Sequence, residues 1–309
     1  MERIPLIIDT DPGYDDALAI VFALGSSVFD LRAVTAAAGN ISIERTYKNA
    51  VRILRYFNSD VPVGRGGGRP LTRELKDGSE IHSPSGLGGV DIPEDVPMPE
   101  LKHSVDLIRE VLESSERRVT IAPIGPLTNI ALLLSIYPEL KDNIDRIVLM
   151  GGAASGGNVT PSAEFNIYAD PEAAKIVFES GLPVVMAGLD VTNGFQIYPE
   201  DFDSYRSMGK CGTFVAEALD AYYAFYKKLG SDFRGPAIHD MIPFAYLAAP
   251  ELFEGRSGRV RVDCSRGSLR GRTAVDFSGS PRSADSFILT GCDREGVLDL
   301  FARSVKALG

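Results

Sequence analysis

The stretch IPLIIDTDPGYDDALAIVFALG, residues 4–25, decides how this chain begins to fold. Residues 4–8 are an uninterrupted apolar run of strand length, and residues 17–24 form an apolar segment that the following glycine can end as a helix. A Pro-Gly pair at positions 12 and 13 supplies the turn between them. The stretch therefore predicts a buried strand that is followed at once by a helix.

Four aspartates, Asp9, Asp11, Asp15 and Asp16, follow this predicted strand. They fall where open α/β sheets bind their ligands. So many carboxylates in one place are costly unless a cation or protons neutralise them, and oxygen ligands favour Ca²⁺ or Mg²⁺. The alternative is structural, because acidic residues suit the first turn of a helix and aspartate suits a turn.

The same strand-then-helix order recurs along the chain. Apolar strands that alternate with helices indicate a mostly parallel sheet covered on both faces. Residues 259–264 and 273–277 instead alternate polar and apolar side chains around a turn and predict an antiparallel hairpin. We therefore predict an α/β fold with a mostly parallel, Rossmann-like central sheet flanked by helices and a C-terminal antiparallel hairpin. The other predicted strands are residues 31–37, 61–63, 119–123, 146–150 and 183–189, and the other predicted helices are residues 43–57, 105–113, 127–135, 171–179, 214–228, 241–248 and 294–307.

Composition limits the domain organisation, the partners and the compartment. No disordered linker or internal repeat divides the sequence, so residues 1–309 are expected to form one domain. The net charge of -10 opposes nucleic acid as the main partner, because phosphate binding needs a basic patch. Three widely separated cysteines favour free thiols. The sequence begins without a signal-peptide pattern and has no apolar run of about 18 residues to cross a membrane, so we expect a cytoplasmic protein without a membrane partner.

Polar residues recur just after the predicted strands. Because the carboxyl ends of parallel strands share one edge of a sheet, these residues should converge on the aspartates. The set is rich in carboxylates and amides and poor in Lys and Arg, which suits a neutral polyhydroxylated ligand such as a sugar better than a phosphate. It consists of Asn40, residues 125–129, Met150, Asn158, Glu164, Asn166, Asp190, Asn193, His239 and Asp240.

The three histidines differ in their surroundings. His239 precedes Asp240 at the edge of the predicted site, and this favours a functional role over a structural one. His82 lies in a long loop, where solvent exposure and a role in covering the site are both open. His103 has no such neighbours and is expected at the surface.

Six motifs together resemble the inosine–uridine-preferring nucleoside hydrolases. They occur in the family's order and span residues 9–247: DTDPGYDDALAI, AAAGN, HSPSGLGG, GPLTNIA, VLMGGAASGGNVTPSAEFNIYADPEAA and AIHDMIPFAYL. One departure is Ser83, where the family often has glycine after the histidine. Tyr14 and the region of Asn193 also vary among such proteins.

The resemblance implies an enzyme that uses water to cleave the N-glycosidic bond of ribonucleosides, giving ribose and a free base. It implies one Ca²⁺ held by Asp11, Asp16, Asp240 and the backbone carbonyl of Thr128, with ribose hydroxyls and a water completing the shell. This oxygen-only set suits Ca²⁺. Asp11 would also take a proton from the attacking water, and His239 would stand near the leaving base. The sequence leaves open whether His239 or His82 protonates that base.

The resemblance also assigns residues to parts of the substrate. Asp15 and Asn166 would bond the ribose hydroxyls, with Asn40 nearby, while Asn158 and Glu164 would hold the 5′-hydroxyl. Cleavage of the C1′–N bond builds positive charge on the ribose, which a carboxylate-rich pocket stabilises. The full substrate-binding set is Asp15, Asn40, Met150, Asn158, Glu164, Phe165, Asn166 and His82.

Two other classes compete with this interpretation. Asp9-Thr10-Asp11 after a strand is similar to the DxD motif of haloacid dehalogenase phosphatases, but Gly13 stands where that family has Thr or Val. A non-catalytic sugar-binding protein is the second, although such proteins are usually exported. The sequence leaves open whether purine or pyrimidine nucleosides are preferred, and relatives suggest a homodimer or homotetramer.

Overall fold

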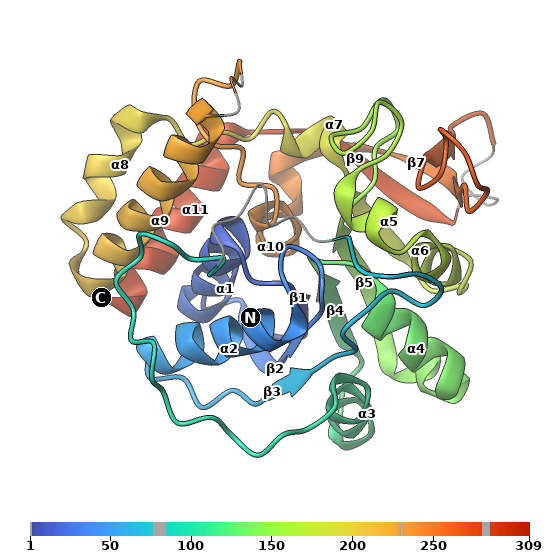
Figure 1. The fold of residues 1–309 in the computed structure, drawn as a ribbon, viewed down its shortest axis with the longest axis horizontal. Coiled ribbons are helices and arrows are strands. Elements are labelled where there is room, and N and C mark those ends of the chain that lie inside the picture. The colour runs from blue at the N-terminus through green and yellow to red at the C-terminus, as the bar shows by residue number, and fades with distance from the viewer. Residues whose placement is uncertain (1, 77–84, 229, 231, 280–284) are drawn as a thin grey trace.

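The computed structural model describes residues 2–76, 85–228, 230, 232–279 and 285–309, and it shows one large sheet between two layers of helices (Figure 1). Within these residues the sheet has nine strands in the order β3-β2-β1-β4-β5-β6-β9-β7-β8. Their bounds are β1 (Ile4–Thr10), β2 (Phe29–Ala36), β3 (Val63–Arg65), β4 (Val119–Pro123), β5 (Ile144–Met150), β6 (Val184–Ala187), β7 (Phe253–Val262), β8 (Thr273–Asp276) and β9 (Ser286–Cys292).

Helices connect the strands and cover both faces of the sheet (Figure 1). The α-helices are α1 (Tyr14–Gly25), α2 (Ile43–Tyr56), α3 (Ser104–Ser114), α4 (Thr128–Ile136), α5 (Phe165–Ala169), α6 (Pro171–Phe178), α7 (Leu189–Thr192), α8 (Pro199–Arg206), α9 (Gly209–Lys228), α10 (Met241–Ala248) and α11 (Arg294–Leu308). Two short 3₁₀ helices, η1 (Pro138–Asn143) and η2 (Pro250–Leu252), precede β5 and β7.

The strand directions confirm the predicted fold class. All pairs from β3 to β9 in the sheet order are parallel, whereas β7 runs antiparallel to β9 and to β8. The predicted C-terminal hairpin is therefore present as β7 and β8. The sheet is mostly parallel, with helices on both faces, as an alternating strand and helix pattern requires.

Some elements differ from the expectations. Strand β9 was not predicted, and β7 begins at Phe253 instead of residue 259. The apolar centre of β9 is only the triplet at 287–289, and its strand conformation depends on pairing with β6 on one side and β7 on the other. Helix α8 was also not predicted, because it is mostly polar and buries only Phe202 and Tyr205. Helix α9 begins at Gly209 rather than residue 214.

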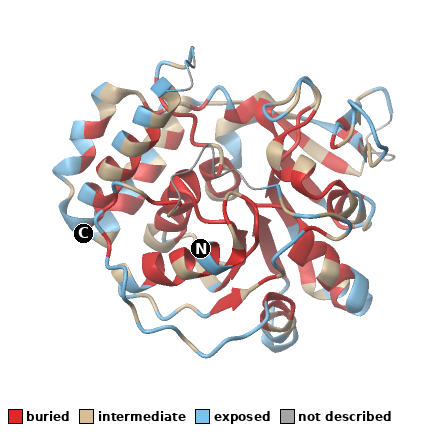
Figure 2. Ribbon diagram, in the orientation of Figure 1, coloured by how far each residue is buried: buried red, intermediate tan, exposed pale blue. Residues whose placement is uncertain are grey.

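Strand β1 lies at the centre of the parallel part, between β2 and β4. Its side chains alternate between the two faces, as strand geometry demands. Leu6 and Ile8 belong to the hydrophobic core on one face, and Ile7 belongs to the core on the other. Since both faces are covered, every residue from Pro5 to Thr10 is buried (Figure 2).

Helix α1 carries the first layer of the larger core. Ten of its twelve residues are buried, and Phe22 packs edge to face against Phe301 of α11 with ring centroids 6.0 Å apart. Its N-terminus is capped from within, because Oδ2 of Asp16 accepts the Gly13 N–H at 2.9 Å. The cap fixes where the aspartates at the start of the helix lie. No helix in the described part of the chain combines the length and apolar character needed to cross a membrane.

Candidate active site

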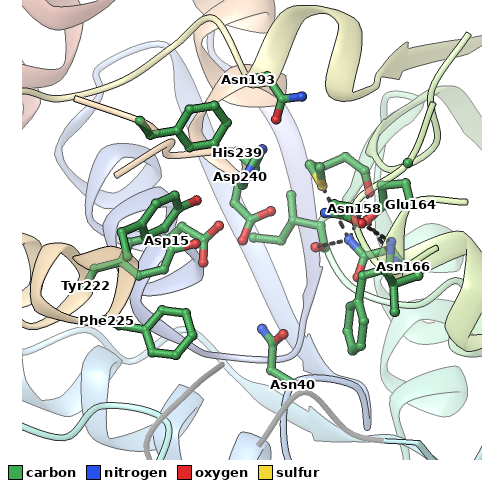
Figure 3. Close-up of a pocket in the computed structure, with 17 residues that line it drawn as sticks. Asp15, Asn40, Asn158, Glu164, Asn166, Asn193, Tyr222, Phe225, His239 and Asp240 are labelled. Atoms are coloured by element: carbon green, nitrogen blue, oxygen red, sulfur yellow. Dashed lines mark hydrogen bonds between the residues drawn. The ribbon is translucent and has the colours of Figure 1, made fainter. Parts of the chain in front are cut away.

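A cavity of about 360 Å³ lies at the carboxyl ends of the parallel strands (Figure 3). Aspartates line one part of it, amide and carboxylate side chains line the opposite side, and aromatic rings close a third part. Residues from distant parts of the chain meet here because the strands run parallel and end at one edge. The lining comprises Asp15, Asn40, Ile124, Met150, Gly157, Asn158, Val159, Glu164, Phe165, Asn166, Asn193, Tyr222, Phe225, Tyr226, Phe233, His239 and Asp240.

Three buried carboxylates meet beside this cavity, and two of them, Asp15 and Asp240, line it. One oxygen each of Asp15, Asp16 and Asp240 lie within 4.8 Å of one another, and in Figure 3 the carboxylates of Asp15 and Asp240 point toward each other. The three residues are at most 6% exposed. Such a cluster of anionic oxygens is the donor set that hard divalent cations take.

Asp11 lies next to this cluster, and its carboxylate is held between two glycines. Oδ2 accepts the Asn40 N–H at 2.6 Å. Oδ1 is buried and has no hydrogen-bond partner among the described residues. A Cβ on Gly39 would lie 2.1 Å from Oδ2, and a Cβ on Gly125 would lie 2.4 Å from Oδ1. Both glycines therefore make room for the carboxylate, and its second oxygen is left for a ligand.

The electrostatics of the cluster also favour a cation. Burial raises the pKa of Asp11 well above its usual range, and the charge of Asp16 raises it further. Burial and then the charge of Asp16 raise the pKa of Asp15 to about 8. Burial, Asp15 and Asp16 likewise raise the pKa of Asp240 well above its usual range. These three carboxylates resist ionisation without a counter-ion, and a divalent cation would stabilise their charged forms.

Asp9, the first aspartate of the stretch, bonds other elements of the fold instead of lining the cavity. Oδ1 accepts hydrogen bonds from the Thr35 hydroxyl at 2.6 Å and from Nδ2 of Asn129 at 2.8 Å. Asn129 also donates to the carbonyl of Ala36 at 3.0 Å. Asp9 therefore connects β1, β2 and α4, and it does not line the cavity. Burial raises its pKa to about 7.

Thr128 is the first residue of α4, and its side chain is fixed by a buried carboxylate. The Thr128 hydroxyl donates to Oδ2 of Asp170 at 2.7 Å. The same oxygen accepts the Leu71 N–H at 2.8 Å, and Oδ1 accepts the Ala173 N–H at 3.1 Å. Asp170 thus caps α6 and holds α4 and the segment around Leu71 against it.

The opposite side of the cavity is built around the short helix α5. Glu164 caps it, because Oε1 accepts the Asn166 N–H at 2.8 Å and Oε2 accepts the Gly152 N–H at 2.8 Å. Burial raises the pKa of Glu164 to about 7. Nδ2 of Asn166 donates to the carbonyls of Ile124 at 2.9 Å and Met150 at 3.2 Å. Both amide hydrogens of Asn166 are therefore used by the protein, which leaves its carbonyl oxygen for a ligand.

Asn158 and Phe165 lie beside each other on this side. Oδ1 of Asn158 accepts the Phe165 N–H at 2.9 Å, so its amide group remains able to donate. Asn158 is exposed at the cavity mouth, while Phe165 is half-buried. The arrangement presents one amide donor and one aromatic ring to anything that enters.

Four aromatic residues form a wall near Asp15: Tyr222, Phe225, Tyr226 and Phe233. Tyr222 stacks on Tyr14 of α1 with centroids 5.5 Å apart, and meets Tyr226 edge to face at 5.0 Å. A hydrogen bond from Tyr222 partly offsets the rise in the pKa of Asp15 that burial causes. The wall offers flat apolar surface beside the carboxylates, which suits a planar heterocycle.

His239 borders the cavity next to Asp240. Its Nδ1 lies 2.8 Å from the Thr192 hydroxyl at the end of α7. Burial lowers the pKa of His239 to about 4. The imidazole therefore stands neutral beside the aromatic wall and the aspartates.

Comparison with known proteins decides the family. Residues 6–299 match the model of the inosine-uridine preferring nucleoside hydrolases. The chain belongs to this family. The match covers nearly the whole chain and confirms the resemblance that the sequence motifs indicated. It also decides against the phosphatase and the non-catalytic sugar-binding protein.

Individual relatives agree with this family along their whole length. The pyrimidine-specific ribonucleoside hydrolase RihA of Escherichia coli K12 is 44% identical over 308 residues, which is 98% of each chain. The purine-preferring ribonucleoside hydrolase from Gardnerella vaginalis has a TM-score of 0.92 at 34% identity, covering 98% of both chains. The plant nucleoside hydrolase PpNRh1 has a TM-score of 0.89 at 29% identity over 99% of each. The chain is a nucleoside hydrolase in sequence and in fold.

The structure describes every expected site residue of this nucleoside hydrolase except His82. Three of them are not among the residues that line the cavity: Asp11, Asp16 and Thr128. His82 lies outside the described residues. The others line the cavity: Asp15, Asn40, Met150, Asn158, Glu164, Phe165, Asn166, His239 and Asp240.

The aromatic wall was not among the site residues that the sequence motifs predicted. Its members on α9 are spaced three and four positions apart, at 222, 225 and 226, which places them on one face of a helix. A helix that packs against the hydrophobic core has aromatic residues at the same spacing, so the spacing could not show whether these residues line a cavity or belong to the core. Thr192 was also not predicted as a site residue, because it contacts His239, which is 47 positions away in the sequence.

Proposed function

We propose that this nucleoside hydrolase is a Ca²⁺-dependent enzyme that cleaves ribonucleosides into ribose and free base. The observation that carries the proposal is the meeting of Asp15, Asp16 and Asp240 within 4.8 Å beside a cavity lined with amides and aromatic rings. Carboxylates suit a cation and sugar hydroxyls, while the rings suit a nucleobase. One site thus offers separate surfaces for the two halves of a nucleoside.

Asp11, Asp16, Asp240 and the carbonyl of Thr128 would hold the ion. The donor set is all oxygen, and Oδ1 of Asp11 is buried with no partner among the described residues, which supports the assignment. Bound Ca²⁺ would supply a Lewis acid that orients the ribose diol and raises the acidity of water. Asp15 and Asn166 bind the ribose hydroxyls, with Asn40 beside them, and fix the ring for attack from one face.

We infer the remaining roles from the resemblance to the family. Asp11 takes the proton of the attacking water. The carboxylates stabilise the positive charge that develops on the ribose ring. Asn158 and Glu164 bind the 5′-hydroxyl, with Met150 and Phe165 against the sugar, and His239 stands at the leaving base. The role expected for His82 stays a prediction.

We further infer that pyrimidine ribonucleosides are the preferred substrates. The support is that the relative with 44% identity over 98% of both chains is a pyrimidine-specific ribonucleoside hydrolase, whereas the purine-preferring relative shares 34%. The aromatic wall by itself accepts either type of ring, since stacking needs only a flat face.

A steady-state panel tests both statements. The enzyme with added Ca²⁺ is incubated with uridine, cytidine, inosine, adenosine and p-nitrophenyl phosphate, and free ribose and phosphate are measured. We expect ribose from uridine and cytidine with the highest kcat/KM and no phosphate release. Higher kcat/KM for inosine or adenosine would overturn the pyrimidine preference alone, and absence of ribose from all nucleosides would overturn the proposed function.

Two organisational expectations also stand as proposals. We infer that residues 1–309 form a single domain, which the unbroken sheet from β3 to β8 supports. The expected homodimer or homotetramer is tested by sedimentation velocity, in which a 33.3 kDa species would exclude it.

A further inference from the structure

Helix α7 ends beside the cavity, and its last residue, Thr192, contacts His239. Oγ1 of Thr192 lies 2.8 Å from Nδ1 of His239. Thr192 is fully buried, at 0% exposure. Within the part of the chain that the structure describes, the histidine is the one hydrogen-bond partner of this hydroxyl. The direction of this hydrogen bond therefore determines which ring nitrogen of His239 carries the hydrogen.

Only one assignment of the hydrogens satisfies both partners. If Nδ1 carried a hydrogen and donated it to Oγ1, the hydroxyl hydrogen of Thr192 would have no acceptor among the described residues. A buried polar hydrogen without an acceptor is energetically unfavourable. If the hydroxyl donates to Nδ1 instead, the hydroxyl hydrogen and the nitrogen lone pair are both satisfied. The hydrogen of the neutral ring then resides on Nε2.

We propose that Thr192 is a positioning residue that donates a hydrogen bond to Nδ1 and so holds His239 in the tautomer with its hydrogen on Nε2. The proposal rests on the proposed role of His239 at the leaving base. Nε2 has no protein partner among the described residues, and His239 lines the cavity. The ring therefore offers its N–H to the substrate.

The rest of α7 keeps Thr192 in place. The Leu189 N–H donates to the carbonyl of Gly152 at 2.9 Å, and the carboxylate of Asp190 accepts the N–H groups of Ala154 at 2.7 Å and Ser155 at 3.2 Å. This short helix is thus bonded to the loop that leads to Asn158. One four-residue helix connects the sugar side of the cavity to the histidine on the other side.

This arrangement assigns His239 the role of a neutral hydrogen-bond donor. As the C1′–N bond breaks, its electron pair goes to the base, and the Nε2–H bond stabilises the negative charge there. Water supplies the C1′ hydroxyl and gives a proton to Asp11. The departing base takes up a proton from solvent, and Asp11 returns its proton to solvent, so the net reaction consumes one water.

The tautomer is directly measurable, because the chain has three histidines. Enzyme labelled with ¹⁵N-histidine and supplied with Ca²⁺ is recorded by long-range ¹H–¹⁵N NMR, and the signal absent from His239→Gln belongs to His239. We expect the Nε2–H pattern in the parent enzyme and in Thr192→Ser, which keeps the hydroxyl. An Nδ1–H or doubly protonated pattern for His239 at neutral pH would overturn the proposal.

Kinetics of Thr192→Val test the positioning role separately. Loss of the hydroxyl should lower kcat for uridine by about tenfold and leave KM within about twofold, whereas p-nitrophenyl riboside, whose leaving group needs no hydrogen-bond donor, should change little. In a His239→Ala background the same substitution should have no further effect. A tenfold loss that persists in that background would show that Thr192 acts elsewhere. Turnover of p-nitrophenyl riboside by the parent enzyme supports the proposed hydrolase function whatever the tautomer.

Discussion

Gly125 lies so close to Asp11 that a Cβ atom on it would be 2.4 Å from Oδ1 of the aspartate. Gly39 limits the other oxygen in the same way, at 2.1 Å. The Asp11 carboxylate therefore fits only because neither neighbour has a side chain, and the Asn40 N–H donates a hydrogen bond to it. Its free oxygen has one fixed position, which is what a metal ligand and general base requires.

Gly125→Ala should consequently displace Asp11 and lower kcat by about a hundredfold, because small misplacements of reacting groups are costly. Calcium affinity, measured by calorimetry, should fall with it. Gly67→Ala is the matched control, since a Cβ there would meet only the Arg69 carbonyl at 3.9 Å. Unchanged kcat and calcium affinity in Gly125→Ala would show that the position of Asp11 is not critical.

Asp11→Ala should remove nearly all turnover, by about a thousandfold or more. One substitution takes away both a calcium ligand and the group that accepts the proton of water. Asp95→Ala, at an exposed position, controls for loss of an acidic residue. The measurement is ribose release under saturating uridine, and a kcat within about tenfold of the parent enzyme would refute both roles.

Removal of divalent metal should abolish activity, and added Ca²⁺ should restore it. Because Ca²⁺ binds the folded state, it should also raise the melting temperature. The free energy of unfolding should increase by about 2.7 kcal/mol when Ca²⁺ is a hundredfold above its Kd. The checks are ribose release and thermal unfolding after chelation and after titration with Ca²⁺ or Mg²⁺. Full activity of chelated enzyme would exclude the metal site.

The metal-free enzyme should lose stability as the pH rises from about 4 to about 8. Burial and the charge of Asp16 raise the pKa of Asp15 from 3.8 to about 8. Between these values the folded state keeps a proton that the unfolded chain has released, so stability falls as the pH increases. Melting temperatures in chelator should decline through this window, and Asp15→Asn should flatten the decline. A melting temperature that rises with pH would contradict the sign.

Asp170→Ala should lower the free energy of unfolding by about 2–4 kcal/mol, because it leaves the Thr128 hydroxyl and two N–H groups without their buried acceptor. Urea unfolding gives the value. Asp142→Ala, on the surface, should change it by less than about 0.5 kcal/mol. Equal effects of the two substitutions would mean that the hydrogen bonds of Asp170 do not stabilise the fold.

Local pattern was enough to predict most of the parallel sheet. The apolar runs of β1, β4 and β5 have the length of buried strands, and Gly and Pro residues separate them from the helices. Strand β9 was missed, because its conformation comes from pairing with β6 and β7 rather than from a strong pattern of its own. Helix α8 was missed for the related reason that only two of its residues face the core.

Sequence patterns alone were enough to predict the α/β class, the family and the types of residue at the site, because these depend on periodicity and on motifs that are continuous in the chain. The neighbours of each side chain could be found only from the folded structure. Asp9 and Asp11 are two positions apart, yet Asp9 accepts hydrogen bonds from Thr35 and Asn129. Asp11 instead lies between Gly39 and Gly125 and accepts the Asn40 N–H. The folded structure also brings Asp240 to Asp15 and Thr192 to His239. The electrostatic field and the hydrogen bonds around a side chain come from neighbours that are distant in sequence.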